Sequence, residues 1–379
     1  MRPESLVQPR SSPAARLALL VAVGLLIYAS LFPNAGWINT GISPFAWIRA
    51  PFPRYWTLAE IVFNVLVYVP LGALLVWSLR PGLRGLGCVV VATVVASALS
   101  FSMECLQTFL PARVASNVDF GANTLGALVG ATLGLVTSRQ LIDLGWHVRW
   151  GEYVFKPNTH ACIVLAGMWL LVQMPAQAML FGTGNIIGLF PDAVLQFEAL
   201  LPRWVASQPE WRVRAEQWCT ALAIIGISAL LGHCLRPGRW RAFVVPALVL
   251  LALGVKALAQ PLTTPGGVDS LAWLTPGAWR GLLTGTVISM VIVVYAPPAW
   301  LRATAVIALI GQLLVVNLFP LDRYFLSSIA TGYTGLLYLE SLAQELAAGW
   351  PLVAIAWMLL GAGSRAAART AHSDSEDPA

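Results

Sequence analysis

Apolar residues along this chain gather into long runs separated by short polar segments. A helix needs about 20 residues to cross the ~30 Å hydrocarbon layer of a membrane, and ten runs approach or reach that length. They cover residues 17–33, 60–79, 86–106, 120–138, 159–178, 217–234, 242–259, 281–297, 302–319 and 349–363. Because helices satisfy their own backbone hydrogen bonds in lipid, the pattern predicts an all-α, polytopic transmembrane bundle of about ten helices.

Two of these runs are weaker than the others. Residues 159–178 meet Pro175 and continue into a second apolar stretch, 178–190, that a re-entrant segment would explain. Residues 242–259 carry Lys256, whose long side chain can reach the interface from near a helix end.

Composition supports the membrane interpretation. The 379 residues are 58% hydrophobic and 11% charged, against about 25% charged in a soluble domain. Five cysteines form no CxxC and the four histidines lack metal-ligand spacing, so no metal or other cofactor is predicted. The net charge of +6 is scattered over short loops, which suits membrane orientation better than nucleic-acid binding.

Basic residues in the short loops set the expected orientation. Arg80 and Arg84 follow the second run, and Arg236, Arg239 and Arg241 follow the sixth, as cytoplasmic loops require. We therefore expect both termini in the cytoplasm and loops 34–59, 107–119, 179–216, 260–280 and 320–348 outside. Residues 1–16 then form a cytoplasmic segment before an uncleaved first helix, residues 194–204 a surface helix, and residues 364–379 a disordered cytoplasmic tail.

A weak internal repeat suggests how the chain is organised. ALLVWSLRPGLRG (73–85) and ALLGHCLRPGRWR (229–241) agree at seven of thirteen positions. Two shorter matches recur at nearly the same offset, as a duplicated four-helix unit would produce. Chance recurrence of short apolar words would explain them equally well. The expected domains are residues 17–138, with four helices, and residues 139–363, with about six, in a degenerate 4+4+2 arrangement.

Polar residues mark the outer ends of the second, third and fourth runs. Residues three or four apart on a helix share a face, and several of these side chains are spaced in that way. Gly126, Gly130 and Gly134 follow on the fourth run and would let another helix approach closely. The candidate site residues are Asn64, Glu104, Gln107, Arg113, Asp119 and Asn123.

Each of these residues also has a structural interpretation. Asn64 and Asn123 would join helices by hydrogen bonds, Arg113 would neutralise a nearby acid, and Glu104 would reach the interface. Asp119 or Asn117 would cap the fourth helix. Ionisable groups within a membrane are nevertheless functional candidates, and several at one depth strengthen that interpretation.

The motifs that carry these residues resemble the VanZ-like membrane family. They are NVLVYVPLG (64–72), SMECLQTFLPAR (102–113) with Ser100 before it, and DFGANTLGALVG (119–130). The resemblance covers residues 17–138 and implies a four-helix membrane domain. It also implies a link to reduced susceptibility to glycopeptides, teicoplanin above all, although the family's molecular activity is not settled.

Three functions fit these observations. The first is an accessory or binding protein of the bacterial inner membrane, with an outward polar site for a lipid headgroup, lipid-linked glycan or glycopeptide. In it Arg113 would pair with an anionic group such as phosphate. The second is an enzyme on lipid-linked substrates with Glu104 or Asp119 as general base, which we favour less because no nucleophile or phosphate loop accompanies them. The third is a transporter with Glu104 as its proton site.

The charge bias predicts where reporter fusions will be active. Fusions after Arg80 and Arg239 should report the cytoplasm, and fusions after Arg54 and Asp269 the outer face, because basic short loops are retained inside. A phosphatase and fluorescent-protein reporter pair checks all four positions. An outward signal after Arg239 would contradict the ten-span topology.

Overall fold

Our computed structural model describes the helical parts of the chain and some of their connections. The described residues are 12–32, 34, 36–39, 41–51, 58–80, 82–138, 153–157, 159–174, 179–186, 209–238, 240–263, 271, 273–319 and 345–360. The predicted surface helix 194–204 and tail 364–379 lie outside them, as do residues 139–152 beside the predicted domain boundary. The surface helix, the disordered tail and the position of the domain boundary therefore stay predictions.

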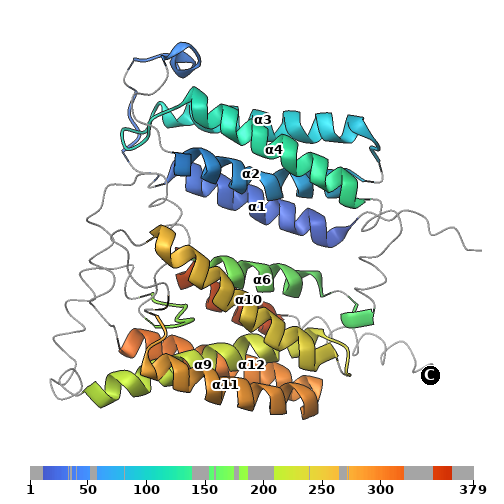
Figure 1. Ribbon diagram of the computed structural model, residues 1–379, viewed down its shortest axis with the longest axis vertical. Coiled ribbons are helices and arrows are strands. Elements are labelled where there is room, and N and C mark those ends of the chain that lie inside the picture. The colour runs from blue at the N-terminus through green and yellow to red at the C-terminus, as the bar shows by residue number, and fades with distance from the viewer. Residues whose placement is uncertain are drawn as a thin grey trace, which may run out of the picture. The chain divides into compact units, whose positions relative to one another are not determined.

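The described chain is built from α-helices, as predicted. In order these are α1 (Pro13–Leu31), α2 (Leu58–Leu79), α3 (Leu86–Gln107), α4 (Asn117–Ser138), α6 (His160–Leu171), α9 (Pro209–Cys234), α10 (Trp240–Thr263), α11 (Pro276–Tyr295) and α12 (Pro298–Leu318) (Figure 1). A short 3-10 helix, η1 (Ala46–Arg49), lies between α1 and α2, and a further apolar helix covers Glu345–Leu360.

Eight of the ten predicted spans are helices long and apolar enough to cross a membrane, within the part of the chain that was described. The other two are shorter. The run predicted over 159–178 contains α6, whose 12 residues extend only about 18 Å. The run predicted over 349–363 overlaps the helix Glu345–Leu360. The chain is a multi-pass membrane protein.

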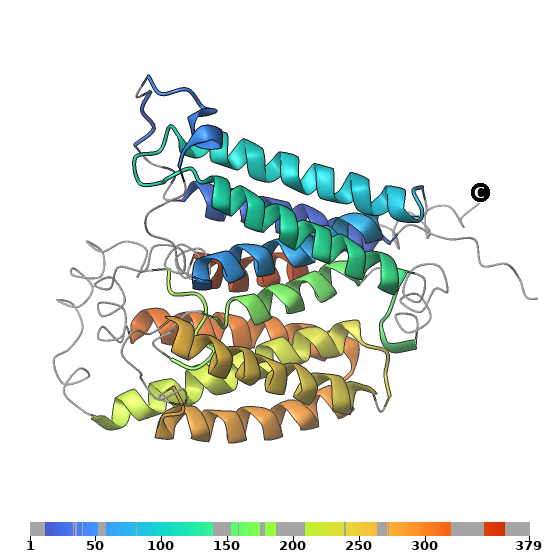
Figure 2. The ribbon, with the colours of Figure 1, turned by 45° about the horizontal axis from the view of Figure 1, so that its top comes forward.

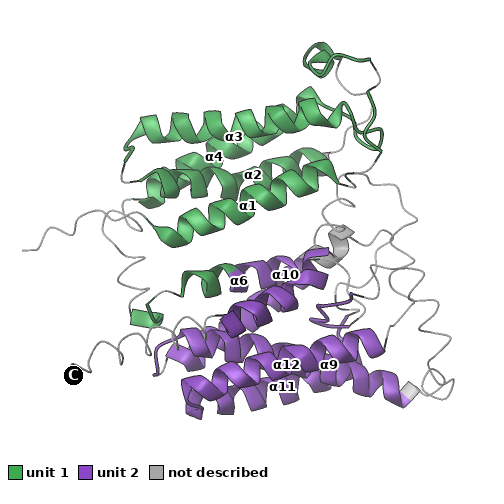
Figure 3. Ribbon diagram, turned by 180° about the vertical axis from the view of Figure 1, so that it is seen from behind, with its two compact units in different colours: residues 1–164, 334–342 green, residues 165–333, 343–379 purple. Residues whose placement is uncertain are grey.

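The chain divides into two compact units (Figure 3). Unit 1 comprises residues 1–164 and 334–342 and contains α1 to α4. Unit 2 comprises residues 165–333 and 343–379 and contains α9 to α12. The polar residues singled out from the sequence all belong to unit 1.

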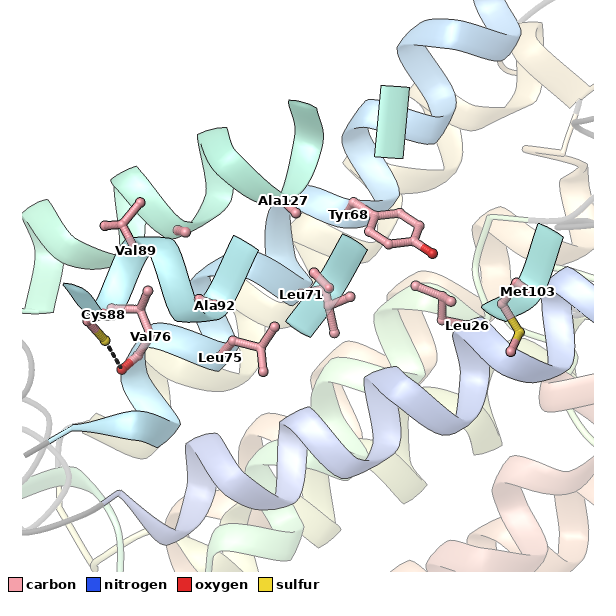
Figure 4. Close-up of a cluster of buried hydrophobic side chains, with 12 residues drawn as sticks. Leu26, Tyr68, Leu71, Leu75, Val76, Cys88, Val89, Ala92, Met103 and Ala127 are labelled. Atoms are coloured by element: carbon pink, nitrogen blue, oxygen red, sulfur yellow. Dashed lines mark hydrogen bonds between the residues drawn. The ribbon is translucent and has the colours of Figure 1, made fainter. Parts of the chain in front are cut away.

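Alanines alternate with larger side chains in the interior of unit 1, where α1 to α4 lie side by side (Figures 1 and 2). The core contains Ala92, Ala96, Ala127 and Ala131 at 0% exposure, together with larger residues such as Leu71 (Figure 4). In lipid the helices gain little from the hydrophobic effect, so close van der Waals contact must hold them together. Alanine cores permit that contact.

The closest contact joins α2 and α4 through the predicted glycines. A Cβ atom added to Gly126 would lie 2.3 Å from the carbonyl oxygen of Val65, and one added to Gly130 would lie 1.9 Å from that of Val69. Gly134 meets Ala73 in the same way. Each glycine contacts a residue four further along α2, so the two helices run parallel. The predicted close approach to α4 is confirmed, and α2 is its partner.

Unit 2 contains a second parallel pair of this kind. Cβ atoms added to Gly277 and Gly281 of α11 would lie 2.6 Å from the carbonyl oxygens of Val213 and Gln217 of α9. Gly285 follows one turn later against Ala221. The shared spacing is what a duplicated unit would produce, and the duplication itself remains a prediction.

The α2–α4 contact predicts a sharp difference between two glycines of one helix. Gly130→Ala should lower the free energy of unfolding by about 2 kcal/mol, because the new methyl group meets backbone that cannot yield. Gly121→Ala is the control, since open space surrounds that position, and it should be neutral or stabilising by up to about 1 kcal/mol. Thermal unfolding of the purified protein in detergent measures both. Equal stability of the two variants would contradict the contact.

Candidate functional site

The candidate residues lie at one end of unit 1, where α1 and α3 end and α2 and α4 begin. Glu104 is in the last turn of α3 and is only 3% exposed. Its Oε2 atom accepts a hydrogen bond of 2.7 Å from the backbone N–H of Ser116. The carboxylate is therefore inside the bundle and does not face lipid, as the shared-site hypothesis requires.

Ser116 caps the start of α4. Its Oγ atom accepts from the backbone N–H groups of Val118 at 3.2 Å and Asp119 at 3.3 Å. The expectation that Asn117 or Asp119 would be the cap is wrong. In a capping box an acid three residues after the cap bonds back to the cap's own N–H. Here Glu104, from a different helix, accepts from that N–H and so ties α3 to α4.

Asp119 connects α4 to α2. Its carboxylate hydrogen-bonds the side chain of Asn64 and interacts electrostatically with Glu60 and Arg113. Glu104 interacts electrostatically with the same aspartate and the same arginine. Asp119 thus interacts with both other acids, and Arg113 interacts with Glu104 and Asp119.

A second polar layer lies one turn deeper. Asn123 donates from Nδ2 to the Oγ atom of Ser100 at 2.9 Å, and the hydroxyl of Tyr68 also hydrogen-bonds Ser100. These three residues come from α4, α3 and α2. Asn123 is 8% exposed, and its Oδ1 atom has no hydrogen-bond partner among the residues that the structure describes. A buried acceptor without a donor is costly, and a bound water or ion is one explanation for it.

Arg113 and Gln107 instead serve the end of α1. Arg113 donates from Nε to the carbonyl of Phe32 at 3.0 Å and from a terminal nitrogen to that of Ala29. Gln107 donates to the carbonyl of Ser30 at 2.7 Å. The last carbonyls of a helix have no partner within it, and basic side chains commonly bind them. Both residues therefore have a structural role that the sequence alone did not reveal.

The loop between α1 and α2 folds over this end of the unit. Trp47 of η1 is 5% exposed, and its ring lies 5.3 Å from that of Phe101 in α3 and 5.6 Å from that of Phe120 in α4. Asn117 donates to the carbonyl of Ala50 at 2.9 Å and so holds the loop in place. Trp47 therefore packs against the two helices that carry Glu104 and Asp119.

Asn64, Glu104, Asp119 and Asn123 lie at the same end of unit 1, and their role as a binding site stays a prediction. Sequence reasoning missed Ser116, for which a signal existed, because Ser116 and Asp119 have capping-box spacing. Within the described ranges, no three His, Cys, Asp or Glu side chains are grouped so that they could hold a metal ion.

Comparison with known families identifies this part of the chain. The family model described as VanZ/LLP1 matches residues 16–138, which run from α1 to the last residue of α4. Those residues form a VanZ-like domain, as the resemblance in the three motifs indicated. No curated protein and no solved structure matches the chain.

The arginine contacts predict a loss of stability without a change of fold. Arg113→Met should lower the free energy of unfolding by about 1–3 kcal/mol, because the carbonyls of Ala29 and Phe32 would lose a charged donor. Arg49→Met is the control, since Arg49 is an exposed arginine in η1 at the same end, and it should change stability by less than about 0.5 kcal/mol. Thermal unfolding in detergent compares them. If both variants are equally stable, the α1 contact is not stabilising.

Proposed function

We propose that this VanZ-like membrane protein is an accessory protein of the bacterial cytoplasmic membrane. In this proposal it binds the polar part of an envelope component at the outer end of α2, α3 and α4. The component is a lipid headgroup, a lipid-linked glycan or a glycopeptide. One observation carries the proposal: Glu104, which is buried, and Asp119, which is partly buried, lie at the same end of an apolar helical bundle.

Charge is not needed for the contacts that these acids make. Glu104 accepts one backbone N–H, which the carbonyl oxygen of a glutamine would accept equally well. A charged residue costs about 2.5–3.5 kcal/mol at the centre of a membrane helix and less near its ends. Two nearby acids also repel each other when both are ionised. Glutamine and asparagine would make the same contacts without charge. The presence of two acids at these positions therefore favours a role in binding.

The chemistry of the site favours a ligand that donates hydrogen bonds. Glu104, Asp119 and the Oδ1 atom of Asn123 are acceptors, whereas Arg113 already donates to two carbonyls of the α1 end. The hypothesis that Arg113 pairs with a phosphate is correspondingly weaker. Hydroxyl or amine groups of a glycan, headgroup or glycopeptide would supply the missing donors.

The expected orientation supports the same proposal. With both termini in the cytoplasm, the ends of α1 and α3 and the starts of α2 and α4 face outward, where envelope lipids and glycopeptides are present. A protein that held such a molecule would change how much of it is accessible. Altered teicoplanin susceptibility is a consequence that this arrangement would permit.

Binding accounts for the arrangement better than transport or catalysis does. Transport sites usually lie near the bilayer midplane at a repeat interface, whereas these groups lie at helix ends. For an enzyme on lipid-linked substrates, one of the two acids would act as general base, and each already accepts a hydrogen bond within the fold.

Glu104→Gln tests the proposal directly. Native mass spectrometry of protein purified in mild detergent should show a bound lipid or glycan on the wild type. That mass should be lost in Glu104→Gln and in Asp119→Asn, which remove charge and keep shape. Glu210→Gln is the matched control, because the side chain of Glu210 is 82% exposed at the start of α9, and it should retain the ligand.

Folding has to be monitored in the same samples. Each variant should elute as a single species with a melting temperature close to that of the wild type, so that loss of ligand is not loss of structure. Retention of the same mass by a folded Glu104→Gln protein would refute the proposed site. The teicoplanin susceptibility of cells expressing each variant then tests the consequence for the envelope.

A further inference from the structure

We infer that the loop between α1 and α2 contains a segment that lies in the membrane interface, with lipid as its partner. This interfacial segment comprises residues 36–39 and 41–51 and includes η1. The inference is independent of the proposed function, because it holds whether or not unit 1 binds a ligand. It is carried by the depth of the segment, its attachment to the helices, its exposed side chains and its charge.

The segment lies beside the helix ends and not beyond them. The ring of Trp47 is 5.3 Å from that of Phe101 and 5.6 Å from that of Phe120, and Phe45 stacks on Phe101 at 6.0 Å. At about 1.5 Å per residue, Phe101 is about 9 Å from the end of α3, and Phe120 is about 4.5 Å from the start of α4. Figures 1 and 2 show η1 next to α3, on the side of unit 1 away from α1.

The lengths of the helices give that depth its meaning. Both α3 and α4 contain 22 residues, which extend about 33 Å and so slightly exceed the ~30 Å hydrocarbon layer. Their last turns therefore lie at the boundary between hydrocarbon and headgroups. The interfacial segment, which packs against those turns from the side, lies at the same level.

The bundle holds the segment near both of its ends. The backbone N–H of Ile38 donates to the carbonyl of Phe109 at 3.0 Å, and the side chain of Asn117 donates to the carbonyl of Ala50 at 2.9 Å. Between these two contacts, Trp47 is buried against α3 and α4. The outward side chains of the segment consequently have defined positions relative to the helices.

Large apolar side chains cover the outward side of the segment. Five of them within twelve residues are between 44% and 57% exposed, namely Trp37, Ile38, Ile42, Phe45 and Ile48. Soluble proteins rarely expose so many large apolar side chains in one place, because water makes such a patch unfavourable. At the depth of the helix ends, lipid would cover them.

The charges nearby suit a membrane surface. Residues 34–59 contain two arginines and no aspartate or glutamate. Arg49, the last residue of η1, is exposed, and an arginine can lay its aliphatic stem along apolar surface while its guanidinium reaches lipid phosphates. Apolar and aromatic residues next to basic ones are typical of segments that lie in the interface plane. A second protein chain is not needed to explain this surface, since the membrane around the helices already provides the lipid.

The interfacial segment therefore has two functional faces. Trp47 packs inward against α3 and α4, which carry Glu104 and Asp119, while the exposed apolar side chains contact lipid. The segment thus lies between lipid and the part of α3 and α4 where Trp47 packs.

Depth-dependent fluorescence quenching tests the inference on the full chain in phosphatidylcholine nanodiscs. An environment-sensitive fluorophore is attached in turn to Phe45→Cys and Ile48→Cys, in a Cys105→Ser background because the other four cysteines are buried. Lipids with a nitroxide near the headgroup should quench both labels more than lipids with a nitroxide near the chain end, because interfacial side chains reach only about 5–10 Å into the boundary. Iodide in the water should quench them weakly.

Two labelled positions calibrate the measurement. Val94→Cys places the label at an exposed position near the middle of α3, where the deep nitroxide should quench more than the shallow one. Glu210→Cys places it on a side chain that is 82% exposed at the start of α9, where iodide should be the strongest quencher.

A second set of variants tests whether the apolar side chains hold the segment in the interface. With the label at Ile42→Cys, the double change Phe45→Ser and Ile48→Ser should weaken quenching by the shallow nitroxide and strengthen quenching by iodide. Val114→Ser is the matched control, because Val114 is an exposed apolar residue between α3 and α4 outside the segment, and it should leave both unchanged.

Each other outcome would overturn the inference. Strong iodide quenching of the labels at Phe45 and Ile48, without quenching by either nitroxide lipid, would place the segment in water. Protection from all three quenchers would mean that protein covers it, and chemical crosslinking between labelled copies would then identify a second chain as the partner. Stronger quenching by the deep nitroxide would place the segment within the hydrocarbon layer and not at its interface.

Discussion

The close approach of α4 to α2 is the contact on which the rest of unit 1 depends. Backbone meets backbone at Gly126 and Gly130, where even one added methyl group would lie 2.3 Å and 1.9 Å from a carbonyl oxygen. This contact fixes the rotation of α4 relative to α2 and so places Asp119 beside Asn64. The polar residues converge because the apolar part of the same helix allows no other position. Changes to the glycines should therefore disturb the polar end from several turns away.

A second constraint is that helix ends within or near lipid need partners for their last carbonyls. Arg113 donates hydrogen bonds to such carbonyls at the end of α1. In unit 2, Arg241 donates to the carbonyls of Val293 in α11, at 3.3 Å, and Leu235, at 3.1 Å. Arg302 donates to the carbonyls of Met358 and Leu359 near the end of the last described helix. Arg241, one of the basic residues expected to set the orientation, thus also completes helix ends in the fold.

Unit 2 offers a comparison, because an acid of α9 there also contacts the cap of the parallel helix α11. Glu216 of α9 is buried, and its Oε2 atom accepts a hydrogen bond of 2.6 Å from the hydroxyl of Thr275, the N-cap of α11. Arg212, one turn away on α9, lies 3.8 Å from the same carboxylate. The carboxylate of Glu216 thus has one hydroxyl donor and one nearby arginine. Unit 1 instead brings Glu104 and Asp119 together at one end, which is why the proposed binding site is placed there.

The buried segment 179–186 shows how irregular backbone is accommodated in unit 2. Gln312 of α12 donates to the carbonyls of Phe181 and Thr183 at 2.8 Å and 3.2 Å, and Asn317 donates to that of Gly184 at 2.7 Å. Non-helical backbone at membrane depth is tolerated only where protein groups satisfy it. The sequence suggested a re-entrant piece over 178–190, and this stays a prediction. The amides on α12 that complete it are more than 120 residues away in the chain.

The sequence by itself determined the class of protein, the helices and the identity of the polar candidates. These follow from local rules, because backbone hydrogen bonds in lipid require helices about 20 residues long and because side chains four apart share a face. The glycine spacing on α4 predicted a close neighbour for the same reason. Only the tertiary structure decided which helix that neighbour is, and where each polar side chain points. Arg113 binds carbonyls 81 and 84 residues earlier, and Glu104 binds the cap of the following helix across a turn of 12 residues. No local rule specifies such pairs, since they depend on how four helices pack together.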